Sequence, residues 1–86
     1  MKFKIKKWFL DNIQETATRY NIFIDVEDES RTENGIEADA EGYVTVIAEN
    51  NVLAETEKAI KLCLCSGNVI GSYKGWKTWI PKSLIK

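Results

Sequence analysis

The spacing of apolar residues predicts a helix near the start of the chain, over residues 5–20. The apolar positions recur at intervals that place them on one helical face; they are Ile5, Trp8, Phe9, Ile13, Ala17 and Tyr20. No good N-cap precedes this segment, so the alternative is an extended start with the helix beginning near Lys6. We expect Trp8 and Phe9 to be core anchors. Asn21 is the predicted helix end, because asparagine tolerates the left-handed cap conformation.

Apolar and polar residues alternate in the rest of the chain, which is typical of β-strands. Five strands are predicted, at residues 22–26, 43–48, 52–57, 59–65 and 76–80. The Asn-Gly pair at 34–35 is the strongest short turn signal. In the last strand, alternation places Trp76 and Ile80 on the core face and Trp79 on the opposite face. Pro81 cannot donate a ladder hydrogen bond, so it marks a sheet edge.

These elements predict an α+β fold with one N-terminal amphipathic helix packed on a small, curled, mainly antiparallel β-sheet of four to six strands. The chain shows no repeat or linker, and residues 1–86 are expected to form a single domain. A domain this small buries only about 60–65% of its unfolded surface, so a stability of a few kcal/mol is expected. No apolar run approaches the ~20 residues of a membrane span, and no secretory signal follows the basic N-terminus.

Candidate catalytic chemistry is sparse. Cys63 and Cys65 lie two residues apart in a predicted strand, where a direct bridge would strain the backbone. The chain has no histidine, which a metal site would often use and which is the commonest general base at neutral pH. We therefore expect two reduced thiols packed as small apolar groups, with no catalytic residue, metal site or cofactor. The chain is not expected to be an enzyme, although a pair of carboxylates for acid–base chemistry stays open as a weak alternative.

A net charge of −1 hides a strong asymmetry along the sequence, because residues 21–58 contain eleven acids and only two bases. This stretch holds the first candidate site, a partner-binding acidic surface. Its residues are Asp25, Glu27, Asp28, Glu29, Glu33, Glu37, Asp39 and Glu41. Such a surface could mimic a nucleic-acid backbone and occupy a basic cleft on another protein; the other interpretation is a solvated loop. The order of the acids does not match a calcium-binding loop.

The C-terminal third holds the alternative site, because residues 59–86 contain five lysines and no acid. Lys74, Lys77, Trp79 and Lys82 would bind single-stranded nucleic acid, with bases stacked on the ring and lysines neutralising phosphates. The same alternation is also typical of an edge strand whose lysines discourage aggregation. A structural closure is therefore the competing interpretation of this segment.

Two motifs carry a resemblance to a family. The segment Glu55-Thr56-Glu57-Lys58-Ala59-Ile60-Lys61 is followed by Trp79-Ile80-Pro81-Lys82-Ser83-Leu84-Ile85. This pattern resembles small, uncharacterised phage and prophage proteins with an "ETEKAI" strand and a "W-I-P-K-S" ending. The resemblance implies a phage or mobile-element origin, a cytoplasmic location in a bacterial host cell and an accessory role.

The leading hypothesis is a non-enzymatic accessory protein that binds and modulates, or inhibits, a host protein through the acidic surface. The alternative is a small single-stranded nucleic-acid-binding module. The expected partner is a host protein, with nucleic acid possible and no membrane, and the protein is expected to be a monomer or a homodimer.

Overall fold

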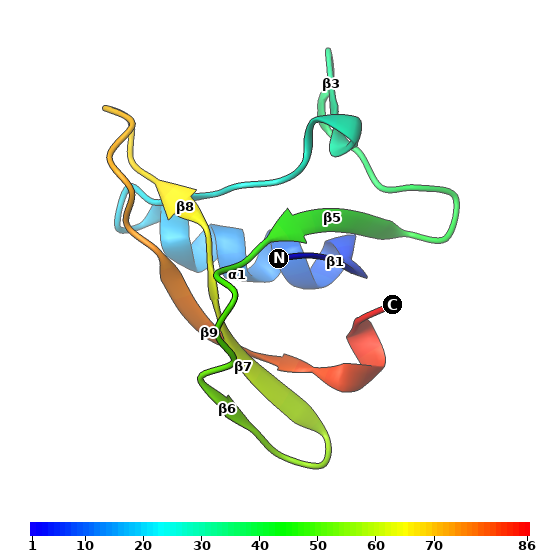
Figure 1. Ribbon diagram of the computed structural model, residues 1–86. Helices are drawn as coiled ribbons and strands as arrows, with labels where there is room; N and C mark the ends of the chain where they lie inside the picture. Colours follow the sequence, from blue (N-terminus) through cyan, green and yellow to red (C-terminus); the bar gives the residue numbers. More distant parts are fainter.

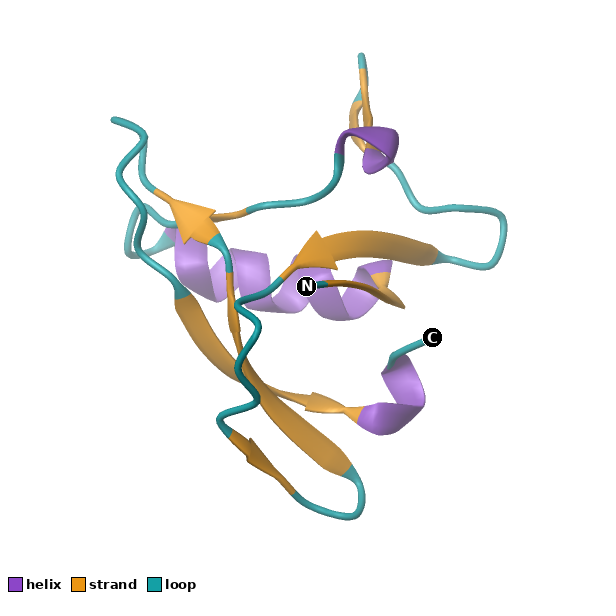
Figure 2. Cartoon of the chain, viewed as in Figure 1, coloured by secondary structure: helices purple, strands orange, loops and turns teal.

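The computed structural model describes all 86 residues. Its elements are β1 (Lys2–Lys6), α1 (Lys7–Thr18), β2 (Phe23–Ile24), the 3-10 helix η1 (Asp28–Ser30), β3 (Arg31–Thr32), β4 (Gly35–Ile36), β5 (Tyr43–Ile47), β6 (Ala54–Glu55), β7 (Ala59–Leu64), β8 (Ser66–Gly67), β9 (Trp76–Pro81) and the 3-10 helix η2 (Lys82–Leu84). One N-terminal helix packs on small antiparallel sheets, which confirms the α+β class (Figure 2).

Strand β1 covers residues for which the apolar spacing predicted the beginning of a helix. Phe3 and Ile5 alternate with lysines, the period expected of a strand, and β1 pairs antiparallel with β5 along its whole length. Helix α1 therefore begins at Lys7 rather than at residue 5, and it ends at Thr18 rather than at 20. The extended start, noted as the alternative, is the one observed, because the ladder satisfies the backbone groups and buries Ile5 completely.

The face that α1 turns to the core is centred on Leu10 and Ala17, both buried. At 3.6 residues per turn, Trp8 lies about 200° around the helix from Leu10. Trp8 is accordingly 55% exposed, so the prediction that it is a core anchor is wrong. Phe9 is half-buried and packs against the core, as expected. Asn21 has a φ of 58°, which matches its predicted role of ending the helix in the left-handed conformation.

The strands curl around the core and nearly close on themselves (Figure 1). Strand β5 pairs with β1 on one side, and on the other it continues to β7 through a bridge between Ala48 and Leu64. Strand β7 then pairs with β9 over six residue pairs. After η2 the chain returns to β1 through a bridge between Ile85 and Ile5. This closure brings the C-terminal end of the chain beside β1 (Figure 1).

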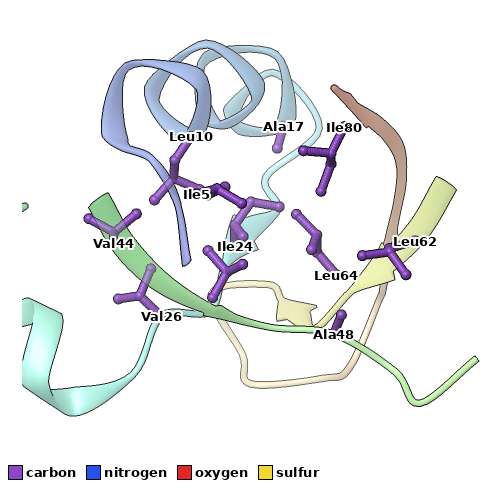
Figure 3. Packing of buried hydrophobic residues seen from close by; sticks show 11 residues of the cluster. Ile5, Leu10, Ala17, Ile24, Val26, Val44, Ala48, Leu62, Leu64 and Ile80 are labelled. Carbon is purple, nitrogen blue, oxygen red and sulfur yellow. The ribbon is translucent and has the colours of Figure 1, made fainter. Parts of the chain in front are cut away.

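The core lies inside this curl and receives residues from α1 and from the strands around it (Figure 3). Its members share nearly complete burial; they are Ile5, Leu10, Ala17, Ile24, Val26, Val44, Val46, Ala48, Leu62, Leu64 and Ile80. Trp76 packs against this cluster, whereas Trp79 is 43% exposed, as the alternation in the last strand predicted. Ser66 is also buried, and its hydroxyl group has no hydrogen-bond partner.

Strand β6 is shorter than the predicted strand at residues 52–57. Thr56 and Ala59 form a tight turn, in which Thr56 N–H donates to the Ala59 carbonyl at 2.8 Å and Ala59 N–H donates to Thr56 Oγ1 at 3.1 Å. The turn ends the strand after Glu55 and leads directly into β7.

Candidate functional site

The eight acids proposed as one surface do not form a continuous patch. Three of them form ion pairs with lysines from the two ends of the chain. The nitrogen–oxygen distances are 2.8 Å for Lys2–Glu27, 3.3 Å for Lys4–Asp39 and 2.7 Å for Lys86–Glu41. These contacts arise because β1 and the C-terminal segment both lie beside the acidic stretch. The charge asymmetry of the sequence is therefore partly cancelled in space.

Asp25 is separated from the other acids. Its N–H donates to the Cys65 carbonyl at 2.9 Å, which places it beside β8. It lines a small hollow of about 250 Å³ together with Phe23, Asn68 and Tyr73. Asp25 thus faces a different part of the molecule from the remaining acids.

Four of the predicted acids remain together on a segment that we name the acidic protrusion, residues 28–37. It consists of η1 and the β3–β4 hairpin, which projects from the body of the molecule (Figure 1). Asp28 and Glu29 lie on η1, Glu33 lies in the hairpin turn and Glu37 follows β4. All four are exposed, and none of them forms an ion pair.

The base of the protrusion is held on β5 by two hydrogen bonds from Thr45. Thr45 N–H donates to Ser30 Oγ at 3.2 Å, and Thr45 Oγ1 donates to Glu29 Oε1 at 2.9 Å. Glu37 N–H donates to the Ser30 carbonyl at 2.9 Å. Ile36 packs against the core from the same hairpin. The carboxylates are consequently presented on an anchored hairpin rather than on a free loop.

A hollow of about 310 Å³ lies beside these contacts, between the protrusion and parts of β1 and β5, and Glu29, Glu37, Asp39 and Lys4 contribute to its walls. Asp39 Oδ1 accepts hydrogen bonds of 2.9 Å from both Tyr43 N–H and Glu41 N–H. The bond from Tyr43 N–H is the largest cause that lowers the pKa of Asp39 below its ordinary value. Asp39 is therefore held ionised, and it orders the loop before β5 rather than serving as a proton donor.

The lysines around this region are also committed to structural contacts. The hydrogen bond with Glu27 raises the pKa of Lys2, and the hydrogen bond with Glu41 raises the pKa of Lys86. Lys6 Nζ donates to the Glu41 carbonyl at 3.0 Å and lies 4.4 Å from the centre of the Tyr43 ring. Lysines therefore border the acidic protrusion on its β1 side.

Only two of the four residues predicted for the nucleic-acid-binding site lie together on one strand face. Lys77 and Trp79 share the outer face of β9, but Lys82 is paired with Glu55 at 2.5 Å. Lys74 lies outside β9, in the loop that precedes it. The strand register places Lys61 of β7 directly opposite Trp79. Lys61 is the residue that sequence reasoning missed, since only the register of β7 against β9 could have found it.

The two cysteines are free, as expected, and Cys63 is buried. Burial raises the pKa of the Cys65 thiol, which favours the neutral form of that group. No group of three or more histidine, cysteine, aspartate or glutamate side chains is placed to hold a metal ion. The single α-helix is too short to cross a lipid bilayer.

No family model, curated protein or solved structure matches this chain. The resemblance to phage and prophage proteins stays a prediction.

Proposed function

We propose that this protein is a non-enzymatic binding protein that captures another protein through its acidic protrusion. The observation that supports the proposal is the set of four exposed, unpaired carboxylates on the anchored segment 28–37. The same segment carries one exposed base, Arg31, so acids outnumber bases on it four to one. An excess of exposed negative charge steers and orients a basic partner. The expected partner therefore presents a basic surface, such as a cleft that otherwise holds nucleic acid.

The finer identity follows from the resemblance of the two sequence motifs alone. On that resemblance, the protein is a phage or mobile-element accessory factor in a bacterial cell, and the partner is a host protein that it modulates. The proposed contact surface is therefore smaller than the eight-residue acidic surface predicted from the sequence. Asp28, Glu33 and Glu37 are exposed and form no ion pair, whereas Glu27, Asp39 and Glu41 are paired with lysines.

The test compares two variants with the same change of charge. D28K/E33K reverses two acids of the protrusion, and E15K/E57K reverses two exposed, unpaired acids elsewhere. Immobilised wild-type protein and E15K/E57K should retain the same protein from a bacterial lysate, whereas D28K/E33K should lose it. Added duplex DNA should displace that protein if its basic cleft binds nucleic acid. Equal capture by both variants would contradict the proposal.

A second candidate is nucleic-acid binding on the outer face of β7 and β9. It is favoured by the row formed by Lys61, Trp79 and Lys77, in which an exposed ring lies beside two lysines. Stacking of one base on Trp79 would contribute about 1–3 kcal/mol. The candidate predicts that single-stranded oligonucleotides quench tryptophan fluorescence in wild-type protein and in W8F but not in W79F, with affinity falling as salt rises. Quenching that disappears in W8F instead would dismiss it.

A further inference from the structure

Strand β9 is the terminal strand of its sheet, whose order is β6-β7-β9. Hydrogen bonds at both ends of the β7–β9 ladder show which residues face β7: Lys82 N–H donates to the Lys58 carbonyl, and Lys74 N–H donates to the Ser66 carbonyl. Because hydrogen-bonded pairs alternate along an antiparallel ladder, the even-numbered residues of β9 bond to β7. The backbone groups of Lys77 and Trp79 therefore point away from the sheet.

These outward groups form a short edge with no partner strand, and the one bond made to them is a long one of 3.4 Å from Thr78 Oγ1 to the Trp79 carbonyl. Neither Lys77 N–H nor Trp79 N–H donates to an acceptor in another part of the chain. Pro81 comes next on the same edge and has no N–H to offer. The side chains of Lys77 and Trp79 are both exposed. An unpaired edge of this kind is a template for another strand.

We propose that this edge pairs with the same edge of a second copy of this chain, antiparallel and with Thr78 on the two-fold axis. In this register Lys77 lies opposite Trp79 of the partner subunit, and Trp79 lies opposite Lys77 of the partner subunit. Each outward N–H then donates to a carbonyl of the other copy, so every free group of both residues is satisfied. Each lysine ammonium also comes within reach of a tryptophan ring, as a cation–π contact requires.

The neighbouring registers are less favourable because of the residues that they place opposite one another. A shift in one direction places Lys77 opposite Lys77 of the partner subunit, and like charges directly opposite are destabilising. A shift in the other direction places Lys77 opposite Pro81 of the partner subunit, which leaves a carbonyl group without a donor. The edge is thus complementary to itself in one register, as a two-fold symmetric interface requires.

A contact confined to one strand edge is small, so the dimer should depend on concentration. Sedimentation equilibrium should show a shift from monomer to dimer as the protein concentration rises. Amide hydrogen exchange reports the same event at single residues. Exchange at Lys77 and Trp79 should slow with rising concentration, while Thr78 and Ile80, already bonded to β7, should not change. Exchange at Lys77 and Trp79 that is independent of concentration would overturn the proposal.

Two variants test the edge and the register separately. K77P removes an outward N–H and the cation but no bond to β7, so it should stay folded and weaken the dimer by about tenfold or more. K77R keeps the outward N–H and the positive charge, so it should dimerise like the wild type.

T78C places two thiols on the symmetry axis, where Cα atoms of a non-hydrogen-bonded pair lie about 4.5 Å apart, within the range for a disulfide. Under mild oxidation T78C should form a covalent dimer that the wild type does not. Unchanged dimerisation of K77P, or no cross-link in T78C, would overturn the proposal.

Discussion

The Tyr73 hydroxyl donates a hydrogen bond to Glu49 Oε1, which ties the loop before β9 to the segment that follows β5. The same hydroxyl lies 3.8 Å from the Sγ atom of Cys63 on β7. The bond with Glu49 is the largest cause that raises the pKa of Tyr73 above its ordinary value. The pair therefore joins two loops across β7 and depends on the protonation state of the phenol.

This contact predicts a specific loss of stability at alkaline pH. The pKa of Tyr73 is higher in the folded state than the value of about 10 in the unfolded state, so its contribution is complete below about pH 10 and is lost as pH rises through the folded pKa. Y73F should be less stable than the wild type at pH 8, and the difference should shrink above pH ~10. Urea unfolding at several pH values measures the difference in free energy of unfolding between the two proteins. A difference that stays constant up to pH ~12 would contradict the prediction.

Asp39 predicts the opposite behaviour at acidic pH. Its folded pKa is lowered, so its contribution is present above the unfolded value of about 3.9 and is lost as pH falls through the folded pKa. D39N should be less stable than the wild type at pH 7, and the two proteins should converge below pH ~4. Thermal unfolding followed by circular dichroism is the measurement. N12D, at an exposed residue of α1, is the control that alters charge without touching this loop.

Ser66 and Ser30 predict opposite effects of the same substitution. Both are buried, but Ser66 Oγ has no hydrogen-bond partner, whereas Ser30 Oγ accepts from Thr45 N–H. S66A should raise the free energy of unfolding by about 0.5–1 kcal/mol, because it removes an unsatisfied polar group. S30A should lower it by about 1 kcal/mol or more, because it leaves Thr45 N–H without an acceptor. A loss of stability in S66A would show that its hydroxyl is satisfied in solution.

Trp8 on α1 and Trp76 on β9 should differ in their contribution to stability. W76A removes a ring that packs against the core and should cost about 2 kcal/mol or more. W8A removes a ring that is 55% exposed and should cost about 1 kcal/mol or less. Chemical denaturation of both variants gives the comparison. An equal loss in the free energy of unfolding would contradict the exposed position of Trp8.

Several features follow from local sequence alone. Alternation in residues 76–80 is enough to place Ile80 inside and Trp79 outside, because side chains of a strand point to opposite faces in turn. Asn21 ends the helix as predicted, since few residues adopt its positive φ at low cost. The exposed acids of the hairpin were also visible as a charge pattern, although their role as a binding site stays a prediction.

Tertiary structure decided the rest, because those features depend on which distant residues meet. The segment before Lys7 is a strand because β5 offers it a partner. The face that α1 turns to the core is centred on Leu10 and Ala17, which leaves Trp8 on the solvent side. Lys2, Lys4 and Lys86 pair with acids that are near them only because β1 and the C-terminal segment both lie beside the acidic stretch. Lys61 lies opposite Trp79 only because of the register in which β7 pairs with β9. Local patterns thus determined which side chains of β9 face the core, whereas long-range pairing determined where α1 begins and which charges remain free.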